Sequence, residues 1–315
     1  MLINWIDIKF TLRQLEIFVA VAQTGSASRA AERLALSQSA TSTALAELEK
    51  SYSQVLFDRV GKSLRMNDTG RWLLPHAMEI LDRARGLENA LGAQTALGPL
   101  NLGASLTIGN YLATLFLADF LQQRPDSRVH LTVHNSTDIV AAVARFELDL
   151  GLVEGNFQHP DVVVEQWLRD ELVVFAAPGH PLAGRQTVSR EEVLDCNWIL
   201  REPGSGTRSA VEHAFGEDRH RLAVRLELEH TEAIKRAVEA GLGLGCISRL
   251  ALRDAFRRGS LVPINVPDLD LRRSFYIIHH RDKYISGGLA LLIGHIRDFT
   301  GNATSTDDIV LTPVP

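Results

Sequence analysis

The chain has 315 residues, a formal net charge of −5, 45% hydrophobic residues and 23% charged residues. This composition fits a globular protein of two or three domains and excludes a uniformly basic nucleic-acid-binding protein, so any DNA contact must come from a local patch. Two cysteines, Cys196 and Cys246, are too few for a disulfide framework and fit a reducing cytosol, and we find neither a signal peptide nor a run of about 20 apolar residues.

The first strong pattern is a set of three helices. Leu12 to Thr24 has apolar residues at helical spacing and is followed by Gly25, which can end a helix. Two shorter helices are predicted at 27–34 and 38–48, separated by a tight joint at 35–37. This order is typical of a helix-turn-helix unit.

The second short helix carries polar side chains near its N-terminus. Ser37 can cap it by accepting a backbone hydrogen bond. We expect Ala40, Ala44, Leu45 and Leu48 on its buried side, and Gln38, Ser39, Ser42 and Thr43 on its outer side. Such short donors and acceptors suit the reading of base edges in a major groove. The alternative is a plain helical hairpin with solvated serines.

A small β-hairpin is predicted next, with strands at 55–57 and 63–66 and a turn at 60–62. It carries the basic residues Arg59, Lys62 and Arg65. Basic side chains beside a two-helix unit fit a wing that contacts DNA phosphates. The alternative is a solvated loop with ordinary charges.

A long helix is predicted over 69–94. Its apolar residues mix three- and four-residue steps, which is typical of a helix with a partner helix, so we expect a coiled-coil dimer. A two-fold dimer presents two reading helices to a roughly palindromic DNA site. The alternative is a helix packed on its own domain, and Pro75 can kink it.

From residue 100 onward, strands and helices alternate, which predicts α/β architecture. Strands are expected at 100–105, 129–134, 149–153, 162–167, 171–177, 198–201, 223–228, 244–248 and 275–279, and helices at 108–121, 137–146, 206–215, 231–240, 251–258 and 289–299. Two such units joined by crossing strands enclose a cleft that takes small ligands at the carboxyl ends of the strands. The polar tail at 301–315 is expected to be flexible.

The most chemically informative stretch is LREPGSGTR at 200–208, between a predicted strand and a helix. Its glycines, hydroxyls and helix N-terminus can converge on an anion. The predicted anion cradle consists of Arg201, Glu202, Gly204, Ser205, Gly206, Thr207 and Arg208. It lacks the lysine of a nucleotide-binding P-loop. The alternative is a turn that caps its own helix.

Polar residues at three other strand ends should face the same cleft: Ser105, Thr107, Ser136, Thr137 and Glu154. Glu154 could accept a hydrogen bond from a protonated ligand or orient Arg201 or Arg208, or it could be a surface carboxylate. The pairs His130–His134 and His279–His280 lack a third ligand, so no metal site is predicted. No catalytic arrangement can be assigned.

Two segments resemble the LysR-type transcriptional regulators. LRQLEIFVAVAQTGSASRAAERLALSQSATSTALAELE is similar to the winged helix-turn-helix of that family, and LFDRVGKSLRMNDTG is similar to its wing. GHPLA at 179–183 and GLGLGCISRLAL at 241–252 resemble landmarks of its effector domain. The chain departs from the family in having Tyr52-Ser53 where leucine-glycine is usual and Ser39 where proline is common.

The resemblance covers about 11–300 and implies the domain organisation. It assigns an N-terminal winged helix-turn-helix DNA-binding domain to 11–68, a long linker and dimerisation helix to 69–96, and an α/β effector-binding domain to 97–300, with a flexible tail at 301–315. The effector domain would be periplasmic-binding-protein-like, with subdomain I at about 97–168 and 270–300 and subdomain II at about 169–269.

The resemblance also implies the function. It indicates a cytoplasmic DNA-binding regulator, not an enzyme, that binds double-stranded DNA as a dimer or tetramer and needs no cofactor beyond a small-molecule co-inducer. The stretch at 200–208 is similar to that of a subgroup tied to sulfur and carbon assimilation, so we expect an oxyanion such as sulfite or a phosphorylated metabolite. The alternative is a small-molecule-binding protein or enzyme on a periplasmic-binding-like fold whose N-terminal helices serve only for dimerisation.

Overall fold

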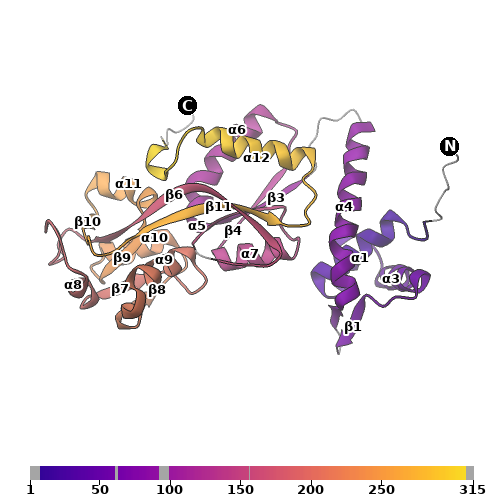
Figure 1. Ribbon diagram of the computed structural model, residues 1–315, viewed down its shortest axis with the longest axis horizontal. Helices are drawn as coiled ribbons and strands as arrows, with labels where there is room; N and C mark the ends of the chain where they lie inside the picture. Colours follow the sequence, from indigo (N-terminus) through magenta and orange to yellow (C-terminus); the bar gives the residue numbers. More distant parts are fainter. Residues whose placement is uncertain (1–7, 61–62, 92–98, 156, 310–315) are drawn as a thin grey trace. The chain divides into compact units, whose positions relative to one another are not determined.

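The computed structural model describes residues 8–60, 63–91, 99–155 and 157–309 (Figure 1). They form two compact units, divided near residue 98. The N-terminal unit contains the predicted helix-turn-helix, hairpin and long helix. The C-terminal unit contains the predicted α/β fold.

Three helices open the N-terminal unit: α1 (Leu12–Thr24), α2 (Ala27–Arg33) and α3 (Gln38–Tyr52). Gly25 ends α1 in the left-handed conformation, as predicted. Ser53 ends α3 with φ +52°. The left-handed end of the helix is therefore present although this chain has serine at the position where glycine is usual in the LysR-type regulators that it resembles. Ala35, in the joint between α2 and α3, also has a positive φ of 53°.

The core of this unit forms where the apolar stripes of the helices meet. Phe18 and Val21 of α1 are fully buried and pack with Leu45 and Leu48 of α3. The expectation for Ala40 was wrong: it is exposed, and Thr41 is fully buried in its place. The buried face of α3 is thus rotated by about one residue at its start, because Thr41, Leu45 and Leu48 follow the helical repeat.

A hairpin and a long helix complete the unit. β1 (Phe57–Val60) and β2 (Ser63–Met66) pair antiparallel, so β1 begins two residues later than predicted. The helix α4 (Asp68–Leu91) contains Pro75 in its second turn, and Leu74, Ala77 and Leu81 are buried against the other helices. The predicted linker residues 92–96 lie outside the described residues.

The C-terminal unit is built on a nine-stranded mixed sheet with the order β4-β3-β5-β11-β6-β9-β7-β8, and β10 pairs with β6. Its strands are β3 (Leu100–Ser105), β4 (Val129–His134), β5 (Leu150–Glu154), β6 (Val162–Ala176), β7 (Asn197–Leu200), β8 (Ala223–Glu227), β9 (Leu244–Ser248), β10 (Val262–Ile264) and β11 (Arg272–His280). β3, β4 and β5 are parallel, as are β7, β8 and β9, which confirms the predicted α/β class.

Helices cover both halves of the sheet. They are α5 (Leu106–Ile108), a π-helical segment (Gly109–Ala113), α6 (Thr114–Gln123), α7 (Ser136–Ala144), α8 (Arg190–Leu194), α9 (Gly206–Phe215), α10 (Thr231–Glu239), α11 (Arg249–Arg258) and α12 (Gly287–Thr300). α6 and α12 lie side by side (Figure 1), with the rings of Phe116 and Phe299 6.1 Å apart. The sequence analysis missed α8 and β10, which are too short to show a periodic pattern.

Two long strands connect the halves. β6 was predicted as two strands but is continuous, pairing with β11 along its first part and with β9 along its last part. β11 also pairs with β5. We call the half that contains β3–β5 subdomain I and the half that contains β7–β9 subdomain II.

The expected flexible tail was wrong for residues 301–309. A short 3₁₀ turn (Thr306–Asp308) follows α12, and its Thr306 is 1% exposed. Residues 304 and 305 run beside β6, where the amide of Arg169 donates to the carbonyl of Thr304. Residues 310–315 lie outside the described residues.

Candidate functional site

The predicted DNA-reading residues lie on the outer side of the start of α3. Ser37 caps the helix, accepting from the amide of Ala40 at 3.1 Å. The Gln38 amide donates to the Ser42 hydroxyl at 3.1 Å, and the hydroxyls of Ser37 and Ser39 are 3.1 Å apart. Ser42 is half-buried, whereas Gln38, Ser39 and Thr43 are exposed. These are weak local contacts between exposed groups, so the same groups can turn to an external partner.

The hairpin places its arginines differently from the prediction. Arg59 is opposite Leu64 and Arg65 is opposite Asp58 in the ladder. Because neighbouring residues of a strand point to opposite faces, Arg59 and Arg65 lie on opposite faces of the hairpin and not in one cluster. Both are exposed, and neither forms an ion pair with the described residues. Lys62 lies outside the described residues.

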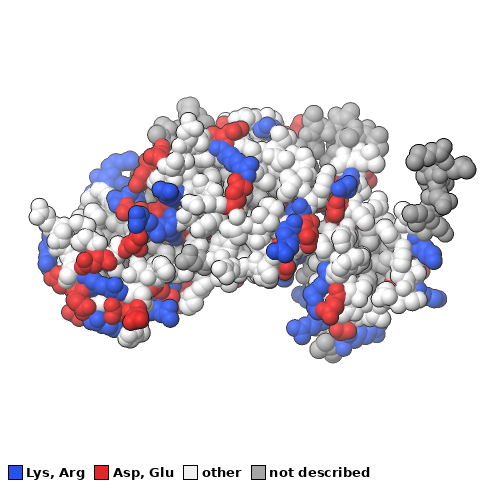
Figure 2. All heavy atoms as spheres, viewed as in Figure 1, with Lys and Arg blue, Asp and Glu red and all other residues white. Residues whose placement is uncertain are grey.

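Basic side chains gather near this hairpin. Figure 2 shows Lys and Arg along the edge of the N-terminal unit where Figure 1 labels β1. The chain carries a net negative charge. A local basic edge on such a chain is the feature that a DNA contact requires.

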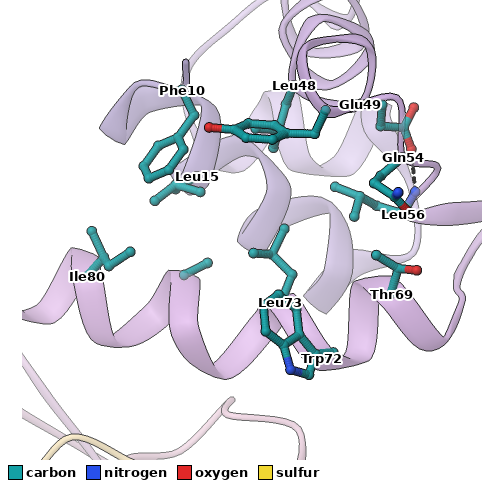
Figure 3. A pocket seen from close by; sticks show the side chains of 12 residues that line it. Phe10, Leu15, Leu48, Glu49, Gln54, Leu56, Thr69, Trp72, Leu73 and Ile80 are labelled. Atoms are coloured by element: carbon teal, nitrogen blue, oxygen red, sulfur yellow. Dashed lines mark hydrogen bonds between the residues drawn. The ribbon is translucent and has the colours of Figure 1, made fainter. Parts of the chain in front are cut away.

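An apolar pocket of about 370 Å³ lies on another side of the N-terminal unit, between α1, α3 and α4 (Figure 3). Phe10, Leu15 and Leu48 line one side of it, and Leu73 and Ile80 of α4 line the other. Trp72, beside them on α4, is 66% exposed, which is high for so large an apolar side chain.

In the C-terminal unit, the predicted anion cradle is filled by its own contacts. Ser205 is the N-cap of α9 and accepts from the amide of Arg208 at 3.4 Å. Arg201 is 2% exposed and donates two hydrogen bonds of 2.8 Å to the carboxylate of Glu202. Arg208 pairs with Glu212. The capping alternative therefore holds for Ser205, and the two arginines are occupied within the chain.

The loop that carries the cradle also contacts subdomain I. Gly204 has φ +90°, a conformation that favours glycine, and its carbonyl accepts from both the amide and the hydroxyl of Thr137. The hydroxyl of Ser136 donates to the carbonyl of Glu154 at 2.8 Å. Next to it, a Cβ on Gly206 would lie 2.0 Å from that same oxygen, so only glycine fits.

Beneath this loop lies a buried charged network that the sequence analysis missed. Arg273 of β11 pairs with Asp170 of β6, with Nε 2.7 Å from Oδ2. It also donates to the hydroxyls of Thr107 in subdomain I, at 3.2 Å, and Thr207 in subdomain II, at 2.9 Å. Glu154 lies 3.6 Å from the same guanidinium. Thr107, Thr207 and Glu154 are thus buried structural partners of Arg273.

Glu154 is only partly satisfied by this network. Its Oε1 accepts from Thr107 at 3.2 Å, while its Oε2 has no partner among the described residues. Burial raises the pKa of Glu154 above its ordinary value of 4.5, and Arg273 and Arg201 offset only part of that effect. The prediction that Glu154 orients an arginine agrees best with these contacts, but the arginine is Arg273 and not Arg201 or Arg208.

Small cavities lie between the subdomains, and two of them are lined by described residues of both. One, of about 260 Å³, is lined by Thr137, Glu154, Ser205 and Arg208, among others. The other, of about 240 Å³, is lined by Leu106, Asn110, Val133, His134, Asn135, Asp138, Glu202, Glu229 and His230. Thr137 and Gly204, which are hydrogen-bonded to each other, both line the first cavity.

The second cavity, which we call the helix-terminus cavity, borders the N-termini of two helices. α5 begins at Leu106 and continues through the π-helical segment into α6, and α10 begins just after His230. Neither N-cap residue, Ser105 or His230, caps its helix with its side chain. The buried hydroxyl of Ser105 has no partner among the described residues. Free amide groups at helix N-termini attract anions.

Other candidate chemistry is weak. Burial raises the pKa of the Cys246 thiol to about 12, which keeps the thiol protonated and unreactive. Within residues 8–60, 63–91, 99–155 and 157–309, no three His, Cys, Asp or Glu side chains are arranged to hold a metal ion. In the same ranges, no helix is both long and apolar enough to cross a bilayer.

Family models match most of the chain. Residues 12–71 match the model described as bacterial regulatory helix-turn-helix protein, lysR family, and residues 93–301 match the LysR substrate binding domain. Among curated proteins, the chain is 43% identical over 279 residues to the uncharacterized HTH-type transcriptional regulator YeiE of Escherichia coli strain K12, covering 89% of this chain and 94% of that protein. It is 32% identical to the HTH-type transcriptional activator CmpR of Synechocystis, covering 88% and 91%.

Solved structures agree with these matches. A full-length OxyR variant of Pseudomonas aeruginosa has a TM-score of 0.69, covers 92% of this chain and 94% of that chain, and at 22% identity supports the fold alone. The regulatory domain of Synechocystis CcmR in complex with 2-PG has a TM-score of 0.60 at 31% identity, covering 65% of this chain and 99% of that chain.

Proposed function

This chain belongs to the LysR family of transcriptional regulators, and we propose that α3 and the hairpin contact DNA under the control of a small anion bound in the C-terminal unit. Membership makes the chain a DNA-binding regulator with an effector-binding domain. It sets aside the alternative of an enzyme or binding protein whose N-terminal helices serve only for dimerisation.

The exposed polar groups at the start of α3 support base reading. Gln38, Ser39 and Thr43 offer donors, acceptors and a methyl group, which is what base edges in a major groove can recognise. Ser37 and Ser42 would support them from the helix start and the half-buried side. Arg59 and Arg65 would contact phosphates from the hairpin, each from its own face.

The helix-terminus cavity of the C-terminal unit favours an anionic effector. Leu106 and His230 line it, at the starts of two helices whose N-termini lack a side-chain cap, and this is the observation that carries the proposal. Glu202 lines the same cavity, but its charge is offset by Arg201. Asp138 and Glu229 favour a ligand that also offers a donor. The regulatory domain of CcmR binds 2-PG, so a phosphorylated metabolite and an oxyanion such as sulfite are the two ligand classes to test.

A second copy of the chain would complete the apolar pocket of the N-terminal unit. LysR regulators form oligomers, and Trp72 and Ile80 on α4 leave apolar surface exposed around that pocket (Figure 3). Pairing there would place two α3 helices on a roughly palindromic site as a dimer, and two dimers would form a tetramer. A regulator that binds bacterial DNA would act in the cytoplasm.

The experiment is a pair of binding measurements on the full-length protein. Duplexes selected from a random pool are labelled, and binding is followed by fluorescence anisotropy between 50 and about 200 mM salt; we expect affinity to fall steeply with salt. Thermal shift with phosphate, sulfite and 2-phosphoglycolate then tests the effector, because a ligand of the native state raises the melting temperature. Absence of DNA binding at low salt would reject the DNA interface, and absence of any shift would reject the anion.

A further inference from the structure

Residues 304–309, after α12, are built onto the C-terminal unit, and we call them the C-terminal strap. Arg253 of α11 donates to the carbonyls of Thr306 and Ile309, at 2.6 and 2.8 Å. The amide of Arg169 donates to the carbonyl of Thr304 at 2.9 Å. The strap lies beyond residues 93–301, which match the substrate binding domain.

One side chain of the strap reaches the buried network. Thr306 donates its hydroxyl to Oδ1 of Asp170 at 2.9 Å, and Ser248 at the end of β9 donates to the same oxygen at 2.7 Å. Oδ2 of Asp170 accepts from Nε of Arg273 at 2.7 Å. Asp170 is 2% exposed, so its orientation is set by these three contacts and not by water.

The guanidinium of Arg273 extends this connection to both sides of the cleft. One terminal nitrogen donates to Thr207 at the start of α9, and the other donates to Thr107 on α5. A guanidinium is planar and its donors are fixed relative to one another. Any rotation that accompanies a change at Asp170 therefore alters the contacts to both subdomains at once.

From these contacts we propose that Thr306 is a positioning residue of the effector domain: the strap fixes Asp170, Asp170 fixes Arg273, and Arg273 holds subdomain I to subdomain II. The effector would then act on a cleft whose resting closure is set partly from the C-terminal strap. Only this last step rests on the proposed function, because the coupling through the network needs neither ligand nor DNA.

The test is hydrogen exchange on the free full-length protein. Thr306→Val removes the hydroxyl and keeps the shape of the side chain. We expect backbone amides at 105–108 and 204–209, on the two sides of the cleft, to exchange about tenfold faster, the fold-change that corresponds to one lost hydrogen bond to a buried charge. Thr306→Ser restores the hydroxyl and should return the exchange rates to those of the wild type.

Thr304→Val is the matched control. It makes the same change in the same segment, but among the described residues the Thr304 hydroxyl forms a hydrogen bond only with Asp308, within the strap. Faster exchange confined to 304–309 in Thr306→Val would overturn the proposal, as would equal effects of the two valine variants at the cleft. If Thr306→Val does not fold, Arg253→Gln loosens the strap without touching Asp170, and unchanged exchange at 105–108 and 204–209 in that variant would also overturn it.

The readout is independent of the proposed function. Hydrogen exchange is measured without an effector, so a failure of the anion to bind leaves this result intact. Conversely, if the exchange rates at the cleft do not respond to the strap variants, the proposal that α3 binds DNA is not affected.

Discussion

Gly206 at the start of α9 lies against the backbone of Glu154 at the end of β5, so close that a Cβ would be 2.0 Å from the Glu154 carbonyl oxygen and 2.7 Å from its carbon. Neither backbone atom can move aside like a flexible side chain. We therefore expect Gly206→Ala to push the subdomains apart and to lower the free energy of unfolding by about 1–3 kcal/mol, measured by urea unfolding.

The control for this prediction is a glycine with open space around it. A Cβ on Gly294 in α12 would meet no atom of the described residues within 4 Å, apart from its chain neighbours and the nearby backbone of its own helix. Gly294→Ala should be neutral or stabilise by up to about 1 kcal/mol, since alanine favours a helix. Equal stability of Gly206→Ala and the wild type would show that the contact between the two subdomains is not tightly packed.

Arg273→Lys tests the shape of the buried network rather than its charge. An ammonium can still pair with Asp170, but it cannot also reach Thr107 and Thr207 in the geometry of the guanidinium. We expect a loss of about 2 kcal/mol in the free energy of unfolding. Arg272→Lys is the matched control, because Arg272 pairs with Asp270 on the surface and should cost little. Similar losses in the two variants would argue against a special role of Arg273.

The elements that could be predicted are those whose signals are local. The apolar spacing of α1, the glycine after it and the serine before α3 lie within a few residues of the structure they determine. The pairing of Arg273 with Asp170 spans 103 residues, and nothing near either residue indicates its partner. The packed Thr306 was missed for the same reason, since its partner Asp170 is distant in sequence.

Several contacts of the candidate effector residues differ from those that the sequence predicted, because Ser205, Arg201 and Thr207 bind partners within the chain. A serine before a helix can cap that helix or bind an anion, and its sequence pattern is the same in both cases. Ser205 caps its own helix. The uncapped N-termini after Ser105 and His230 can be found only when the side-chain hydrogen bonds are known.

The raised pKa of Glu154 predicts a dependence of stability on pH. The native state holds the Glu154 proton more tightly than the unfolded state, so this group contributes stability below pH 4.5 that is lost as the pH rises through the raised native pKa. Glu154→Gln removes this titration. We expect the melting temperature of Glu154→Gln, relative to the wild type, to increase from pH 5 to pH 8. Glu217→Gln, at an exposed position, controls for the removal of one negative charge; a parallel pH dependence in the two variants would contradict the prediction.

Trp72→Glu tests the apolar pocket as a contact between copies of the chain. A carboxylate at the 66% exposed Trp72 costs little in a single chain but would have to be desolvated on pairing. We expect the molar mass in light scattering to shift toward the monomer. Val55→Glu places the same charge at an exposed valine that does not line the pocket. A shift in both variants, or in neither, would mean that the pocket is not the contact.

Arg59 and Gln38 should affect DNA binding in different ways because one is a candidate phosphate contact and the other a candidate base contact. Arg59→Ala should weaken binding to all duplexes alike and reduce the slope of log affinity against log salt by about 0.9.

Gln38→Ala should weaken binding to the selected duplex by about 1–3 kcal/mol and leave binding to random duplexes almost unchanged. Lys50→Ala is the control, since Lys50 is exposed in the last turn of α3, at the opposite end from Gln38. If Gln38→Ala weakens binding to random duplexes as strongly as to the selected one, Gln38 does not read bases, and if Arg59→Ala leaves the salt slope unchanged, the hairpin does not hold phosphate through that side chain.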